Sequence, residues 1–220
     1  VSRAATDGLA TLAFTSTLTP PAVEALARAL ADSSIYVRWG AILALGKAGP
    51  AALKVLPLIE PFAEQPISDL AAVALWAMGE ITARSAPLAA EFAPLLASYV
   101  RPDGNYLEHP LLQRGLLWGL GRLAHARPQL IPEVAECLAP FLAAADPFHR
   151  GLAAWAAGPL PQGPTRAAIL ALVGDPAVFV LYREPLLTEV AVGAAARAAL
   201  DPARRQPLGT PIPEARLKQL

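Results

Sequence analysis

A tryptophan and a glycine recur together along this chain, at intervals that suit a helical repeat. The recurring glycines are Gly46, Gly79, Gly121 and Gly158, which stand 33, 42 and 37 residues apart. A tryptophan lies three residues before each of the last three, at Trp76, Trp118 and Trp155. Self-similarity with a period of roughly 20–50 residues is typical of stacked repeat architectures.

Between these segments lie others whose apolar residues recur at helical spacing. In residues 128–146, for example, Leu130, Val134, Leu138 and Phe141 form one apolar stripe, and the prolines there predict kinks. The repeating unit is therefore a helix–turn–helix of about 37 residues, which buries its apolar side only by stacking on its neighbours. We predict an all-α fold, an α-solenoid of stacked antiparallel helix pairs, over residues 1–174.

The C-terminal part departs from this repeat. Val178, Val180 and Tyr182 alternate with Phe179 and Leu181, in a stretch rich in residues that favour strands. This pattern predicts a β-hairpin with its turn at 183–185 and its second strand over 187–191. One more helix pair is the alternative. We predict a capping unit over 175–200, made of the hairpin and a short helix, and an extended tail over 201–220.

Composition narrows the function. Lysine and arginine number 18 and so do aspartate and glutamate, so the chain lacks the cationic excess of a nucleic-acid or polybasic membrane binder. A single cysteine rules out an intrachain disulfide, and no uncharged apolar run is long enough to span a bilayer. The first ten residues lack a signal-peptide core. We expect a cytoplasmic protein.

The stretch DSSIYVRWGAILALGKAG resembles the bacterial HEAT-like repeat of the phycobilisome-lyase type. The matching residues are Asp32, Val37, Arg38, Ala41, Ala44, Leu45 and Gly46. The motif recurs in degenerate form through Gly158, and SYVRPDGNYLEHPLLQRGLLWGLGRLA is similar to an uncharacterised bacterial family of HEAT-like proteins. The resemblance implies a helical solenoid, and it says little about activity.

The recurring tryptophans have two interpretations, and the recurring arginines have a structural one. Trp76, Trp118 and Trp155 either fill the space between stacked units or line a concave face and stack on a ligand. Arg38, Arg114 and Arg150 lie seven or eight residues before their glycines. The resemblance implies that such an arginine bonds an aspartate or a carbonyl of the adjoining turn, with Asp32 and Asp146 as the nearby acids.

The interval of 42 residues contains an extra stretch, Tyr99 to Pro110. Asp103-Gly104-Asn105 is typical of a turn, and side chains capable of hydrogen bonding follow it. Because long loops on rigid scaffolds often carry function, we expect a partner-binding surface here. Its residues are Asn105, Tyr106, Glu108, His109, Gln113 and Arg114. A solvated connector is the alternative.

We find no catalytic motif in the sequence. The three histidines, His109, His125 and His149, form no i,i+4 pair and have no clustered cysteines, so we expect no metal site and no cofactor. The favoured function is a non-enzymatic scaffold that binds a protein partner, neither nucleic acid nor membrane, through a solenoid surface. The alternative is a lyase or chaperone for a tetrapyrrole or similar cofactor, by analogy of fold. The oligomeric state stays open.

Overall fold

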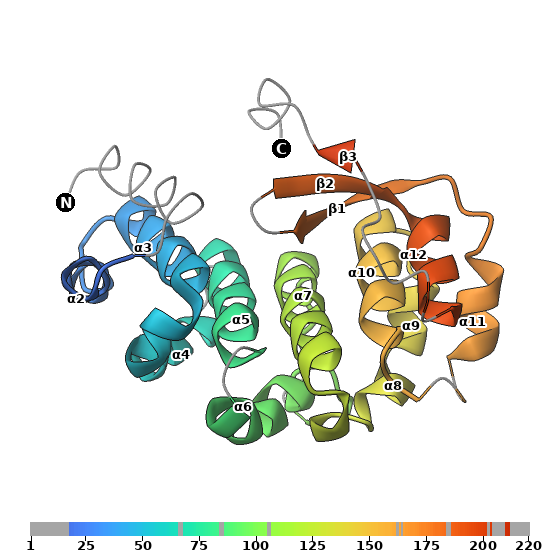
Figure 1. Cartoon of the computed structure of the whole chain (residues 1–220), viewed down its shortest axis with the longest axis horizontal. Coiled ribbons are helices and arrows are strands. Elements are labelled where there is room, and N and C mark those ends of the chain that lie inside the picture. The colour runs from blue at the N-terminus through green and yellow to red at the C-terminus, as the bar shows by residue number, and fades with distance from the viewer. Residues whose placement is uncertain are drawn as a thin grey trace. The chain divides into compact units, whose positions relative to one another are not determined.

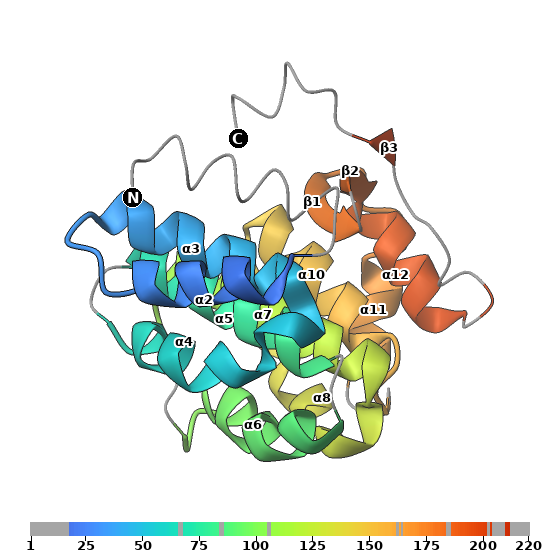
Figure 2. The same cartoon turned by 60° about the vertical axis from the view of Figure 1, so that its left-hand side comes forward.

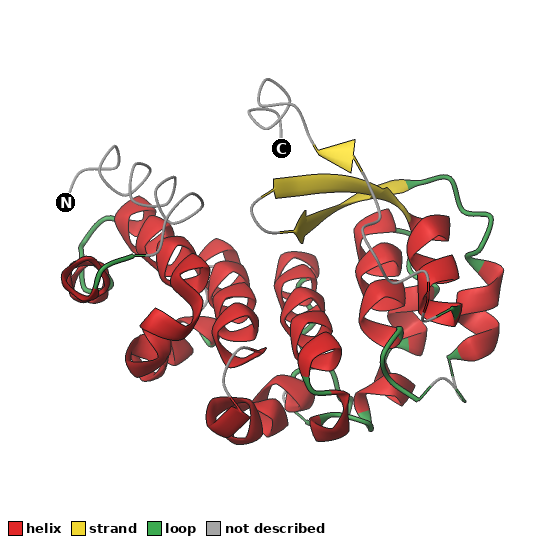
Figure 3. Cartoon of the chain, viewed as in Figure 1, coloured by secondary structure: helices red, strands yellow, loops and turns green. Residues whose placement is uncertain are grey.

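The computed structural model describes residues 18–65, 68–83, 86–104, 107–161, 163, 165–183, 186–201, 203 and 210–211. Contacts divide the chain into unit 1, Val1–Ile131, and unit 2, Pro132–Leu220. Helix dominates both units, and the strands belong to unit 2 (Figure 3). Within the described ranges, no helix is long and apolar enough to cross a bilayer.

The described part of unit 1 contains three antiparallel helix pairs. Its elements are α2 (Pro20–Ala29), α3 (Ile35–Ala48), η1 (Gly49–Val55), α4 (Leu56–Ala63), α5 (Ser68–Ala83), α6 (Ala86–Ser98), α7 (Pro110–Ala126) and η2 (Pro128–Leu130). The second helix of each pair, α3, α5 or α7, is called a B helix below. The B helices lie side by side and run in one direction, while α2, α4 and α6 line one side of them (Figures 1 and 2). This arrangement confirms the predicted fold class of stacked helix pairs.

Local sequence explains where the first B helix begins and ends. Ser34 is the N-cap of α3, and its N–H donates to Oδ1 of Asp32 at 2.9 Å. Gly49 follows the last residue of α3 with a φ of 54°, a left-handed conformation that favours glycine and ends a helix. The turn chemistry on both sides therefore fixes the length of α3.

The repeat glycines let the B helices approach closely. A Cβ added to Gly79 would overlap the Cα of Gly119, and one added to Gly119 would lie 2.8 Å from the carbonyl oxygen of Leu75. Gly46 faces Trp76 and Ala77 in the same way. Because any side chain at these positions would separate the helices, the glycines set the spacing of the row.

Unit 2 contains α8 (Val134–Cys137), α9 (Ala139–Leu142), α10 (Pro147–Ala157), α11 (Arg166–Ala171), β1 (Val178–Arg183), β2 (Leu186–Ala191), α12 (Val192–Leu200) and β3 (Thr210–Pro211). The apolar stripe predicted over 130–141 does not lie on one helix, because that stretch is divided between η2, α8 and α9. Pro132 falls in a turn and Pro140 sits in the first turn of α9, where its ring and lost N–H do no harm. Val134, Leu138 and Phe141 are nevertheless buried.

The predicted hairpin is confirmed. β1 pairs antiparallel with β2, in a register that places Phe179 opposite Val190 and Leu181 opposite Thr188. The ring of Phe179 fills the space that a side chain at Gly151 of α10 would occupy. The short helix predicted after the hairpin is α12. The predicted boundaries at 174 and 200 stay predictions.

Candidate functional site

The three B helices present equivalent positions on one side. Each carries a stripe at i, i+7 and i+11, a spacing that returns to the same face of a helix. The stripes are Tyr36, Leu43 and Lys47 on α3, Asp69, Trp76 and Glu80 on α5, and Leu111, Trp118 and Arg122 on α7. The first position of each stripe is exposed, whereas the last two positions are buried or half-buried. Towards the C-terminal ends of the helices, this face carries a cluster made of Lys47, Trp76, Glu80, Trp118 and Arg122. At the N-terminal ends, the face has an exposed rim.

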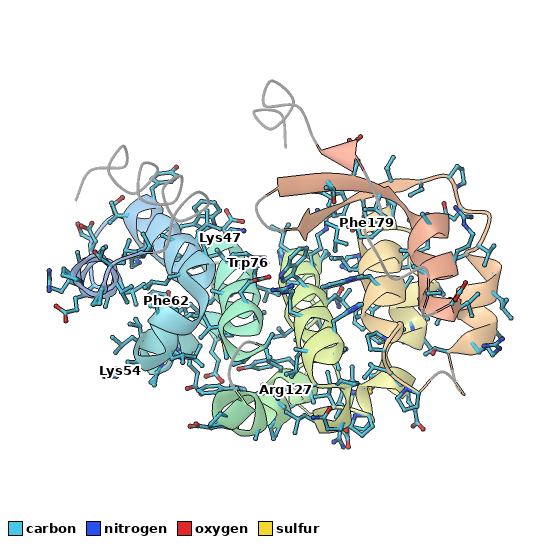
Figure 4. All side chains as sticks on the ribbon, viewed as in Figure 1. Lys47, Lys54, Phe62, Trp76, Arg127 and Phe179 are labelled. Carbon is cyan, nitrogen blue, oxygen red and sulfur yellow. The ribbon has the colours of Figure 1, made fainter. Side chains whose placement is uncertain are left out.

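Two aromatic contacts join the three helices within the cluster. The ammonium of Lys47 lies 4.5 Å from the centroid of the Trp76 ring, an arrangement that attracts a cation to the ring face. Figure 4 shows these two side chains next to each other, from α3 and α5. The rings of Trp76 and Trp118 follow at 6.5 Å between centroids, tilted by 39°. Trp76 thus links α3 to α7.

A carboxylate lies at the centre of the cluster. Glu80 is 1% exposed, and its Oε1 accepts a 2.8 Å hydrogen bond from the indole N–H of Trp118. Nε of Arg122 lies 2.9 Å from the same oxygen. A buried carboxylate is tolerated only when donors and cations surround it, so this contact set ties α5 to α7.

Sequence reasoning missed the charged members of this cluster, although a signal was present. Lys47, Glu80 and Arg122 are each the residue directly after a repeat glycine. A fixed position in a repeat stacks on its equivalents, so charges of alternating sign at that position indicate a row of interacting side chains. The tryptophan positions alone do not show this row.

The three predicted tryptophans differ from one another in burial and in the unit to which they belong. Trp118 is only 5% exposed, as its packing interpretation predicts, and Trp76 is half-buried between two helices. Trp155 lies on α10 of unit 2 and is also half-buried. The alternative, in which all three stack on a ligand, stays a prediction.

The open end of the face carries exposed aromatic and polar side chains. We call it the N-terminal rim, and it comprises Tyr36, Trp39, Asp69, Glu108, His109 and Leu111. Tyr36 is 61% exposed and Trp39 39%, which are high values for such large aromatic side chains. Tyr36 is not among the residues predicted from the sequence. Tyr36 lies seven residues before Leu43, the position that Asp69 occupies on α5 and Leu111 on α7. This equivalence would have placed Tyr36 on the same face.

The predicted loop surface reaches the same rim, because residues 107–109 lead directly into α7. Asn105 and Tyr106 lie outside the described residues. Nδ1 of His109 accepts the N–H of Leu111 at 3.3 Å, so His109 caps α7. Nε2 of Gln113 donates to the carbonyl of Leu107 at 2.8 Å. Glu108 is exposed and Arg114 half-buried. These contacts tie Leu107 and His109 to α7, and partner binding by the loop stays a prediction.

The repeated arginines bond backbone carbonyls, as the resemblance implied. Nη1 of Arg38 donates to the carbonyls of Asp32 and Ser33 at 2.8 and 3.1 Å. In unit 2, Nη1 of Arg150 donates to the carbonyls of Ala144 and Ala145 at 2.9 and 2.6 Å, at the same two offsets in sequence. The repeat arginine therefore ties the preceding turn to its helix at both positions.

Arg150 pairs with an acid that was not predicted. Nε of Arg150 lies 2.8 Å from Oδ2 of Asp175, while Asp146 caps α10 and pairs with His149. Burial raises the pKa of the Asp175 carboxyl. The Ala177 N–H and the Arg150 guanidinium together lower it by more than burial raises it, so the pKa lies below its ordinary 3.8. Local sequence patterns do not indicate this pair, because 25 residues separate its members.

No group of three or more histidine, cysteine, aspartate or glutamate side chains in the described part of the chain is placed to hold a metal ion. The described site is thus an aromatic and charged face of a helical repeat.

Comparisons with known proteins agree with this fold. The chain matches no family model and no curated protein. Among solved structures it is similar to a designed armadillo repeat protein at 14% identity and a TM-score of 0.58, covering 93% of each chain. A second designed armadillo repeat protein, in complex with the peptide (KR)4, matches at 15% identity and 0.58, covering 92% of each chain.

A third similar structure is that of computationally designed armadillo repeat proteins for modular peptide recognition, at 14% identity and a TM-score of 0.54. It covers 90% of this chain and 91% of the other. At such low identity, the likeness establishes a helical repeat solenoid and nothing further about function.

Proposed function

We propose that this chain is a non-enzymatic scaffold that binds an extended segment of a protein partner along the N-terminal rim. The observation that carries the proposal is the exposure of Tyr36 and Trp39 on the outward side of α3. Large exposed aromatic side chains dominate the binding energy of protein interfaces.

The chemistry of the rim suits a peptide. Tyr36, Trp39 and Leu111 offer exposed apolar anchors. Asp69 and Glu108 are also exposed at the N-terminal ends of the B helices, and their carboxylates can accept peptide N–H groups. Because the B helices run in one direction, their N-terminal ends form a continuous row along which an extended chain can lie. The similar designed proteins named for peptide recognition and for a bound (KR)4 peptide support this choice by analogy of fold alone.

The finer assignment to bacterial HEAT-like repeats of the phycobilisome-lyase type is part of the same proposal. It rests on the turn at Asp32, the carbonyl bonds of Arg38 and the recurring glycines. The alternative of a lyase or chaperone for a tetrapyrrole follows from that assignment only, whereas the exposed aromatic rim favours a partner.

Selection of displayed random dodecapeptides on the full chain tests the proposal. We expect selected peptides to bind the wild type and to lose at least tenfold in affinity for the double variant Tyr36→Ser and Trp39→Ser, measured by fluorescence polarisation. The matched control is Leu58→Ser on α4, because Leu58 is an equally prominent apolar side chain, 53% exposed, away from the rim.

Equal binding to the wild type and the rim variant would overturn the proposal, as would a selection that yields no binder. A second double variant, Glu108→Ala with His109→Ala, asks whether the loop takes part. If its affinity for the selected peptides is unchanged, the loop is a connector and the aromatic residues bind alone.

A further inference from the structure

The small sheet of unit 2 has two different edges. Its strand order is β1-β2-β3, so β2 is central and β1 and β3 are the outer strands of the described sheet (Figure 3). β3 is only two residues long and ends in Pro211, which has no N–H to offer a further strand. β1 is six residues long. One edge is therefore blunted, and the other is a full-length strand.

The hydrogen-bond pattern shows which backbone groups of β1 face outward. The N–H of Val192 donates to the carbonyl of Ala177 at 2.8 Å, so these opposite residues form a bonded pair. Bonded pairs alternate along an antiparallel ladder, so Phe179 and Leu181 also bond across to β2. The residues between them, Val178, Val180 and Tyr182, turn their N–H and C=O groups to the outer edge.

The outer edge also lacks the features that usually prevent strand pairing. Proteins protect edges with proline, inward charges, bulges or very short strands. From Val178 to Tyr182, β1 has no charged residue, proline or glycine, and its register with β2 is continuous without a bulge. The side chain of Val178 is 48% exposed, so another strand can approach β1 at this residue.

Packing on the other side holds this edge in place. Phe179 and Leu181 are each only 1% exposed, and Phe179 lies against Gly151 of α10. Thr188 of β2 adds a 2.9 Å hydrogen bond from its hydroxyl to the carbonyl of Leu181. The strand is thus fixed in an extended conformation before any partner arrives, which lowers the entropic cost of pairing.

We propose that β1 pairs antiparallel with β1 of a second copy of this chain, across a two-fold axis at Val180. Val180 then lies opposite its own equivalent, and Val178 lies opposite Tyr182 of the other copy. All three outward-facing residues find backbone partners in this register, and the two sheets continue into one. The inference does not depend on the proposed function, which concerns unit 1.

A second copy is a better occupant than an unrelated strand, because the edge is complementary to itself. A two-fold interface needs the same patch on both sides, and opposed like charges would prevent it. Here Val180 meets its own equivalent, and no charged residue lies between Val178 and Tyr182, so no like charges oppose each other over this stretch. Opposed β-branched residues are favourable cross-strand pairs.

The test compares two lysine substitutions in unit 2 of the full chain. Val180→Lys places two ammonium groups opposite each other across the proposed axis, while leaving the bonds between β1 and β2 intact. Leu170→Lys on α11 is the matched control, because Leu170 is 52% exposed and lies on no strand. Sedimentation equilibrium over a dilution series measures the dimer dissociation constant of each protein.

We expect a concentration-dependent dimer for the wild type and for Leu170→Lys, and a dissociation constant at least tenfold higher for Val180→Lys. In hydrogen exchange, the amides of Val178 and Val180 should be protected in the dimer and lose that protection on dilution. Val178→Lys is a second variant that should act in the same direction, in case Val180→Lys does not fold.

A wild type that stays monomeric at its highest soluble concentration overturns the proposal. A folded Val180→Lys that dimerises as tightly as Leu170→Lys also overturns it, as does a dimer in which the Val178 and Val180 amides exchange freely. The outcome of the peptide selection changes none of these results, so the two proposals fail or stand separately.

Discussion

The indole nitrogen of Trp118 donates a 2.8 Å hydrogen bond to Oε1 of Glu80, a carboxylate that is 1% exposed. This bond runs between α7 and α5, where Gly79 and Gly119 bring the two backbones into contact. The close helix packing and the polar bond support each other, because the glycines bring the indole within reach of the carboxylate. The stability of unit 1 should therefore depend on both.

Two substitutions of Trp118 should distinguish the contribution of its packing to stability from that of its hydrogen bond. We expect Trp118→Ala to lower the free energy of unfolding by about 3–5 kcal/mol, as buried aromatic truncations do. Trp118→Phe keeps most of the ring and removes the donor to a buried carboxylate, so we expect about 1–3 kcal/mol. Urea denaturation measures both. Trp39→Ala, at an exposed position, is the control and should change stability by about 0.5 kcal/mol or less.

Gly119→Ala should reverse the usual effect of alanine in a helix. Alanine gains about 1 kcal/mol over glycine in helix propensity, but here the new Cβ would lie 2.8 Å from the Leu75 carbonyl oxygen. We expect a net loss of about 1–3 kcal/mol in thermal or urea unfolding, typical of overpacking. Gly174→Ala is the control, since nothing lies within 4 Å of the added Cβ. Stabilisation by Gly119→Ala would contradict the close approach of α5 and α7.

Acid should remove the contribution of Asp175. Its folded pKa lies below the ordinary 3.8, so the ionised carboxylate stabilises the fold above that pH. That stabilisation is lost as the pH falls through the folded pKa. We expect Asp175→Asn to lower the melting temperature at pH 7, and the difference from wild type to shrink below pH 3.8.

The control for this experiment is Asp103→Asn. Asp103 pairs with Arg101 at 2.7 Å, and the hydrogen bond from Arg101 lowers the pKa of Asp103, but both side chains are exposed to solvent. Exposed ion pairs contribute little. A melting temperature for Asp103→Asn that falls as far as that of Asp175→Asn would show that partial burial of the Arg150 pair has no effect.

His109 should be replaceable as a helix cap. Its Nδ1 accepts the N–H of Leu111, a role that asparagine performs better and alanine cannot perform. We expect His109→Asn to match or exceed the wild-type stability and His109→Ala to lose about 0.5–1 kcal/mol, measured by urea denaturation. Equal loss in both variants would indicate that His109 acts through another contact.

The sequence by itself determined the repeat, the helix pairs and the hairpin. These features depend on local spacing: apolar residues at helical period, tryptophan and glycine at a fixed offset, and alternation from Val178 to Tyr182. The resemblance to HEAT-like repeats implied the carbonyl bonds of Arg38, whose partners lie in the adjoining turn. The sequence did not predict the helix boundaries over residues 130–141. Val134, Leu138 and Phe141 are buried there, but the chain is divided into three short elements.

Only the tertiary structure decided which distant side chains meet. Lys47 meets Trp76, and Arg122 meets Glu80, although each pair is far apart in sequence, because glycine packing sets the spacing of their helices. Arg150 pairs with Asp175 for the same reason, because a pairing across 25 residues depends on how elements stack. Likewise, alternation predicts a strand, but which of its residues turn their N–H groups outward is fixed by register, and register exists only once β1 and β2 have paired.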